Sequence, residues 1–202
     1  MIEKLHSKVK ARLSEKRFRH TLGVVNMADF LASKCLPDMR CELLYAAYLH
    51  DITKELCDIE QGALLKECPF TLTEDELLSK PIHHSYTAPF VIKRDFPEYA
   101  TENVLSAVLK HTVADADMSV FDEIIFVADF IEEKRTYKSC VEMREYVLSS
   151  LGDDIDENVM HLHNATLKII DFTLDFIEKN GLRKIKKTLL AKEALERKIK
   201  QK

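Results

Sequence analysis

Residues 41–51 read CELLYAAYLHD, an apolar stretch that ends in a histidine and an aspartate. Leucine, alanine and tyrosine occupy almost every side of a helix drawn through residues 41–49, and this pattern predicts a buried central helix. A carboxylate in such surroundings is costly unless it is paired or binds a metal ion, so Asp51 needs a partner. Taken alone, the dipeptide is also explained by an ordinary buried His-Asp pair.

Helical spacing of apolar residues continues on both sides of this stretch, beginning with Ile2, Leu5, Val9 and Leu13. Residues with the spacing of helix caps recur along the chain, and Gly181 follows a long apolar segment as a C-terminal cap does. These cap candidates are Thr73 with Glu76, Thr101, Ser119 with Asp122, and Ser139 with Glu142. No strand-type alternation persists and no internal repeat is found, so we expect an all-α fold.

Composition supports one helical domain. The chain has only 4 Gly and 5 Pro among 202 residues, whereas together they average about 12% of protein sequences. Sheets and sandwiches need these residues in their turns, so the composition argues against them. A hydrophobic content of 46% is enough for a full core. The net charge of −4 argues against a protein that wraps nucleic acid over its whole surface.

The five cysteines show no C-x-x-C spacing, a pattern typical of reduced thiols in the cytoplasm rather than of a disulfide framework or a zinc ribbon. We find no signal peptide at the N-terminus and no apolar run of about 18 residues. We therefore expect a cytoplasmic protein without a membrane span.

One shift in charge divides the chain into residues 1–181 and a basic helical tail of residues 182–202. The tail carries nine Lys and Arg against two Glu, a net charge of +7, so the rest carries −11. A solvated terminal helix is the simpler interpretation, and an arm that attracts polyanions is the alternative.

Further histidines and a carboxylate stand in settings like that of His50-Asp51. His20 lies one predicted helix earlier, His83-His84 follows Pro81, and Asp129 interrupts the apolar run 124–130. Together with His111, they form a ligand set of nitrogen and carboxylate oxygen, which suits iron, manganese, cobalt or zinc. Helices that converge on such residues can hold two ions. His6, His161 and His163 lack this arrangement, and we expect structural roles for them.

The order of these residues resembles the HD-domain metal-dependent phosphohydrolases, and more narrowly the bacterial symmetrical bis(5′-nucleosyl)-tetraphosphatases. The resemblance covers approximately residues 12–180 and is most specific in three blocks: Arg17–Gly23 (RFRHTLG), His50–Lys54 (HDITK) and His111–Arg135. The resemblance implies a helical bundle around two iron ions. One ion would be held by His20, His50, Asp51 and Asp129, and the other by Asp51, His84 and His111. The spacing to Arg94 favours His84 over His83.

The resemblance also implies a hydrolase that cuts diadenosine tetraphosphate into two ADP by attack of metal-activated water. Catalytic roles fall to Asp51, Lys54 and Arg135, and substrate contacts to His20, Lys54, Thr112 and Arg135. Lys54 is three residues after Asp51 and would share its helical face if the helix continued. Surface ion pairing is the alternative for both cations. Another HD nucleotidase or phosphodiesterase, and a nucleotide- or RNA-binding module without turnover, remain rival functions, and a homodimer stays open.

The loop after His111 departs from the family pattern. Its relatives carry a Gly- and Pro-rich loop with a basic residue, whereas this chain has Ala114-Asp115-Ala116-Asp117. If the loop borders the phosphate site, the two carboxylates repel a polyphosphate and raise KM. Alternatively, Asp115 and Asp117 point to solvent or contact the ribose or base.

Overall fold

The computed structural model describes residues 1–69 and 71–201, and helices with short connections make up these ranges without any strand. The expected all-α fold is therefore confirmed. The helices are α1 (Ile2–Lys10), α2 (Glu15–Cys35), α3 (Arg40–Leu49), α4 (Asp58–Glu67), α5 (Glu74–Leu78), α6 (His83–Asp95), α7 (Glu102–Lys110), α8 (Val120–Ile131), α9 (Lys138–Ser149), α10 (Ile155–Lys179) and α11 (Lys186–Lys200). Single turns of 3₁₀-helix cover Pro37–Met39, Lys80–Ile82 and Pro97–Tyr99.

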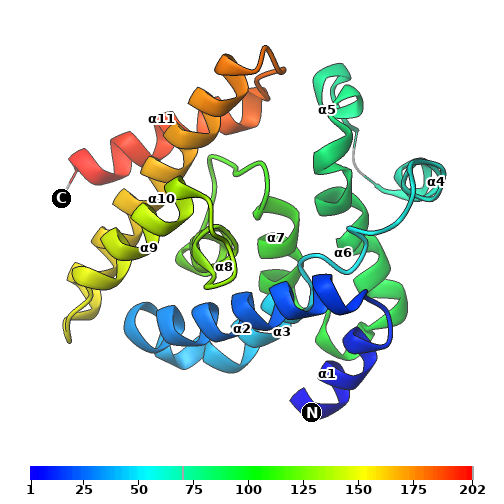
Figure 1. Cartoon of the computed structure of the whole chain (residues 1–202), viewed down its shortest axis with the longest axis horizontal. Coiled ribbons are helices and arrows are strands. Elements are labelled where there is room, and N and C mark those ends of the chain that lie inside the picture. Colours follow the sequence, from blue (N-terminus) through cyan, green and yellow to red (C-terminus); the bar gives the residue numbers. More distant parts are fainter. Residues whose placement is uncertain (70, 202) are drawn as a thin grey trace.

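The apolar stretch 41–49 forms α3, which packs against α2, α7 and α8. Leu43, Ala46 and Leu49 are completely buried there. Two sets of helices flank this centre: α9, α10 and α11 lie on one side of α8, and α4, α5 and α6 lie on the other side of the molecule (Figure 1). Both α3 and α7 contact α8, and the residue after α3, His50, lies 3.9 Å from Asp129 in the last turn of α8.

Most of the expected helix ends are confirmed. The side chains of Thr73, Thr101 and Ser119 accept the backbone N–H three residues on, as N-caps do. Gly181 has φ +62°, and its N–H donates to the Glu178 carbonyl while Leu182 N–H donates to the Ile177 carbonyl. This pair of bonds is the Schellman arrangement, which favours glycine because of the positive φ.

The predicted cap at Ser139 is wrong, because α9 begins at Lys138 and its N-cap is Tyr137, two residues earlier. A tertiary contact accounts for the difference. The Arg144 guanidinium donates to the carbonyls of Ile131, Glu132 and Arg135, so it fixes the segment that leads into α9. That segment, rather than a capping side chain, sets where the helix starts.

The basic segment after residue 181 forms α11, which packs along α10 and buries Thr188, Ala191 and Leu195. Lys192 lies 2.6 Å from Asp171, and Lys198 lies 3.2 Å from the buried carboxylate of Glu123. The Thr188 hydroxyl donates to the Val113 carbonyl at 2.6 Å. Part of the tail's charge is thus paired with carboxylates of the helices beneath it; Lys202 lies outside the described residues.

None of the helices in the described ranges combines the length and the apolar character needed to cross a membrane.

Candidate metal centre

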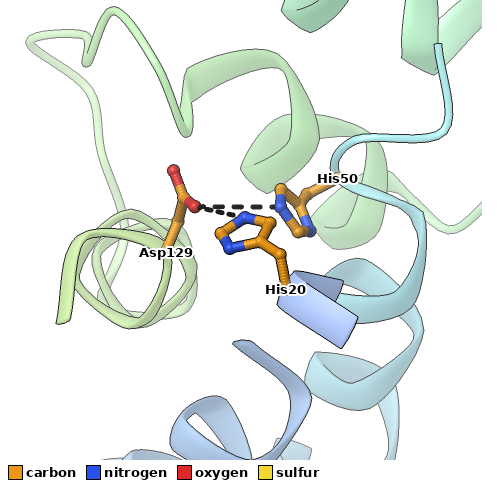
Figure 2. A group of neighbouring side chains, drawn as sticks. All are labelled: His20, His50 and Asp129. Carbon is orange, nitrogen blue, oxygen red and sulfur yellow. Dashed lines mark ion pairs between the residues drawn. The ribbon is translucent and has the colours of Figure 1, made fainter. Parts of the chain in front are cut away.

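His20, His50 and Asp129 come together from three different helices (Figure 2). His20 projects from α2, His50 follows the last residue of α3, and Asp129 lies in α8. The Asp129 Oδ1 atom is 3.0 Å from His20 Nε2 and 3.9 Å from His50 Nε2. These three side chains form the first of two groups that could hold a metal ion.

The second group consists of Asp51, His84 and His111, all of them buried. His84 is in the first turn of α6, and His111 caps the C-terminal end of α7. The Nε2 atoms of these histidines are 3.1 Å apart. The three helix ends that bring in His50, His84 and His111 explain why residues distant in sequence meet here.

Asp51 lies between the two groups and presents one carboxylate oxygen to each. Its Oδ1 is 3.3 Å from His84 Nε2 and 3.7 Å from His111 Nε2. Its Oδ2 is 3.5 Å from His50 Nε2 and 3.7 Å from His20 Nε2. A carboxylate in this position can bridge two metal ions.

The orientation of three histidine rings fits metal binding through Nε2. His50 and His111 donate from Nδ1 to the carbonyls of Ala47 and Val108, and His20 donates from Nδ1 to Glu132. Such bonds leave Nε2 as the ligand atom. Within the described residues, the buried Nε2 atoms of His20 and His50 have no hydrogen-bond partner. A metal ion bound by these nitrogens and the neighbouring carboxylates would give each buried nitrogen a partner.

The carboxylates of Asp51 and Asp129 and the ring of His84 are in the forms that bind metals, whereas His20 holds a proton that an ion would displace. Burial opposes ionisation of Asp51, but His50 and His111 outweigh it and hold the pKa well below the usual carboxyl range. Burial of Asp129 is outweighed in the same way, chiefly by Arg135, and its pKa is also lowered. Burial and the adjacent His111 hold the pKa of His84 well below the usual range, so its ring is neutral. For His20, burial lowers the pKa, but the adjacent carboxylates of Asp129 and Glu132 outweigh it and raise the pKa to about 9.

Glu132, whose role the sequence interpretation missed, positions His20. Its side chain is 1% exposed, accepts from His20 Nδ1 at 3.1 Å and accepts the backbone N–H of Lys134 at 2.7 Å. Room for it comes from Gly23, one turn after His20 in α2, because a Cβ at this position would overlap the Glu132 carboxylate. A glycine inside an apolar helix that also carries a candidate ligand is the signal that indicates this close approach.

Cationic side chains surround the acidic ligands. Arg17, a further residue that the interpretation did not single out, lies 2.7 Å from Asp51 Oδ2, and Arg135 lies 2.7 Å from Asp129 Oδ1. Lys54 Nζ is 3.2 Å from His84 Nδ1. The Thr112 hydroxyl is 3.1 Å from His84 Nε2 and 3.0 Å from His111 Nε2. The helix of Asp51 was expected to continue to Lys54, but α3 ends at Leu49. A turn in which the Lys54 N–H donates to the Asp51 carbonyl places Lys54 at the centre instead.

Two adjoining cavities open at this centre. One, of about 250 Å³, lies over the second group and includes Arg17, Lys54, Thr112 and Arg135 in its wall. The other, of about 770 Å³, begins at His20 and Arg135 and is lined mainly by cations. Its charged residues are Lys16, Arg17, Arg19, Lys134 and Arg135 against Glu55 and Glu132. This charge pattern favours an anionic ligand.

The remaining histidines lie elsewhere. His83 Nε2 faces the carbonyls of Glu76 and Leu77, outside both groups. His6 contacts the Tyr48 hydroxyl, His161 the Tyr146 carbonyl and His163 the Glu123 carboxylate, in keeping with structural roles.

The loop 114–117 does not border the cavity over the second group, contrary to the expectation that its carboxylates repel substrate there. Asp115 accepts the N–H of Ala116 at 2.7 Å, and Asp117 pairs with Lys110 at 2.9 Å. Ala114 has φ +61°, a conformation that few residues other than glycine adopt. Neither Asp115 nor Asp117 lines the cavity over the second group.

The comparisons with known proteins agree with this geometry. The HD domain family model matches residues 17–133, which include all six candidate ligands. The chain therefore belongs to the HD domain family. A crystal structure from Clostridium acetobutylicum, described as a predicted HD superfamily hydrolase involved in NAD metabolism, has the same fold, with a TM-score of 0.83, 24% identity and 98% of each chain covered.

Two curated relatives define the group within the family. The symmetrical bis(5′-nucleosyl)-tetraphosphatase of Halalkalibacterium halodurans is 31% identical over 164 residues, covering 79% of this chain and 84% of the relative. The protein of the same name from Bacillus subtilis is 26% identical over 153 residues, covering 75% and 80%. Within the HD domain family, the chain belongs with the symmetrical bis(5′-nucleosyl)-tetraphosphatases.

Proposed function

We propose that this protein hydrolyses dinucleoside polyphosphates and cuts diadenosine tetraphosphate symmetrically into two ADP molecules. The observation that carries the proposal is the position of Asp51, with one carboxylate oxygen toward each of two histidine groups. The names of the relatives from H. halodurans and B. subtilis support the choice of substrate. The five cysteines, free wherever the structure describes them, keep the cytoplasm as the expected location.

Two transition-metal ions belong to the proposal, iron first, with manganese, cobalt or zinc as alternatives. His20, His50, Asp51 and Asp129 would hold one ion, and Asp51, His84 and His111 the other. Such ions, when bound, polarise phosphoryl oxygens and activate water for attack on phosphorus.

The other residues of the centre bind and orient the polyphosphate. Arg17 and Arg135 lie beside the acidic ligands and present guanidinium donors that match phosphate oxygens. Lys54 and the Thr112 hydroxyl lie on the side of the second group and donate to oxygens there. Lys54 and Arg135 neutralise the charge that develops on the departing ADP.

Product analysis tests the proposal. The purified protein, loaded with iron or manganese, is incubated with diadenosine tetraphosphate and the nucleotides are separated by anion-exchange chromatography. We expect ADP as the sole nucleotide product and about two metal ions per chain by elemental analysis. Equal amounts of AMP and ATP would contradict symmetrical cleavage, and absence of turnover with every metal would contradict the proposed function.

A further inference from the structure

An aromatic pocket lies beside the metal centre, on the side formed by α10 and the segment that joins α8 to α9. It has a volume of about 470 Å³. Phe130, Tyr137, Phe172 and Phe176 supply its aromatic walls. Neither the metal ligands nor the phosphate-binding cations account for these four rings.

Three of the four aromatic rings are unusually exposed. Phe172 is 39% exposed, Phe176 60% and Tyr137 74%. Phe172 and Phe176 are four residues apart in α10 and therefore lie on one face of the helix. Apolar rings gathered around a concavity mark a binding site more often than isolated exposed apolar side chains do.

The aromatic pocket adjoins the cavity over the metal ligands. Phe130, Arg135 and Thr173 line both spaces. Arg135 points one nitrogen at Asp129, 2.7 Å away, while its buried Nε atom has no hydrogen-bond partner among the described residues. The Arg135 guanidinium therefore lies between the aromatic pocket and the candidate metal ligand Asp129.

Polar groups at the rim complete the pocket. Asp175 lies between Phe172 and Phe176 on the same face of α10, and Lys179 lies one turn further on. The Asp175 carboxylate takes part in none of the hydrogen bonds or ion pairs found within residues 1–69 and 71–201, so it is free to accept an N–H from a ligand. The pocket thus offers flat apolar walls and an acceptor at the edge.

We propose that the aromatic pocket binds the nucleobase of one half of the dinucleoside substrate. The inference rests on the proposed function and adds to it the residues that recognise the nucleoside. The order of aromatic rings, guanidinium and metal ligands matches the order of base, α-phosphate and scissile anhydride along one half of a dinucleoside tetraphosphate. Aromatic side chains stack on any base, so Phe172 and Phe176 act as the stacking surface and Tyr137 closes the outer side.

Leucine substitutions test this assignment, because they remove the ring but keep an apolar side chain. The variants are Phe172→Leu and Phe176→Leu, and the matched control is Phe30→Leu, since Phe30 in α2 is also 39% exposed and lines none of these cavities. The dissociation constant of ADP is measured for each metal-loaded protein by calorimetry. Inorganic tripolyphosphate, which has phosphates but no base, serves as the second probe.

We expect the dissociation constant of ADP to rise about tenfold in each pocket variant, as loss of base stacking requires, and to stay at the wild-type value in the control. Binding of tripolyphosphate should be unchanged in all of them. Equal ADP affinity in the wild-type protein and the pocket variants would overturn the inference, and so would a parallel loss of tripolyphosphate affinity, which indicates a disturbed metal centre. The proposed function is judged separately, by whether the wild-type protein cleaves diadenosine tetraphosphate.

Discussion

Replacing Gly23 by alanine should disable the metal centre although the new side chain is a single methyl group. The Cβ atom of Ala at this position would overlap Glu132 Oε2 and lie 3.1 Å from its Cδ. Glu132 cannot turn into solvent without cost, because it is buried and holds both His20 and the backbone of Lys134. The carboxylate must therefore move away from His20.

The magnitude follows from two opposing effects. Alanine in place of glycine inside a helix stabilises by about 1 kcal/mol. Loss of a hydrogen bond to a charged group costs about 1.5–3 kcal/mol, so we expect Gly23→Ala to lower the free energy of unfolding by about 1 kcal/mol. The larger effect is on function, since disturbing the partner of a ligating histidine lowers metal affinity or activity about 10–100-fold.

Gly62→Ala is the matched control. Gly62 also lies inside a helix, α4, but a Cβ there meets no atom within 4 Å. The control should therefore gain about 1 kcal/mol of stability and keep wild-type metal binding. Metal affinity is measured by titrating the apoprotein, and stability by thermal unfolding. If Gly23→Ala binds metal as tightly as the wild type, the argument for Glu132 as the positioning residue of His20 is refuted.

Three further predictions concern the centre and the surface. Asp51→Asn should remove turnover more completely than any single histidine substitution, because Asp51 faces both groups; turnover near the wild-type rate would contradict a bridging role. His84→Ala should lower the metal content measured by elemental analysis, whereas His83→Ala should leave it unchanged, and the reverse order would assign the ligand to His83. Hydrogen bonds from Arg94 and Arg12 hold the pKa of Asp95 at about 2 against burial, so its stabilisation is complete above the unfolded pKa near 4 and is lost as the pH falls toward 2. Asp95→Asn should then reduce the acid-induced loss in the free energy of unfolding by about 1 kcal/mol, as measured by denaturant titrations at a series of pH values. An unchanged pH dependence would contradict this ion pair.

The tertiary contacts of the loop 114–117 also alter an expectation about substrate affinity. Asp117 is paired with Lys110, and Asp115 is engaged by its neighbour's backbone, so neither carboxylate is aimed at the cavity over the second group. The repulsion expected from two acidic residues after His111 therefore has no support in the structure. Orientation to solvent, the alternative interpretation, agrees with the ion pair to Lys110.

The sequence by itself determined the helical fold and the types of ligand. Apolar spacing around residues 41–49 and the scarcity of Gly and Pro depend on local geometry, which repeats every turn of a helix and is readable without a structure. The capping side chains of Thr73, Thr101 and Ser119 act within a few residues of their own position, and these predictions were accordingly right. The start of α9 was not, because it depends on the contacts that Arg144, within α9, makes with the carbonyls of Ile131 and Arg135.

Only the tertiary structure decided how the residues of the centre face one another. Local spacing does not reveal that the oxygens of Asp51 point to different groups, that Gly23 makes room for Glu132, or that Phe172 and Phe176 open toward Arg135. These relations depend on the packing of α2, α3, α8 and α10, whose contacts join residues far apart in sequence. A helix pattern specifies which side of each helix is buried, whereas distances of about 3 Å between ligands arise only when the helices are packed together.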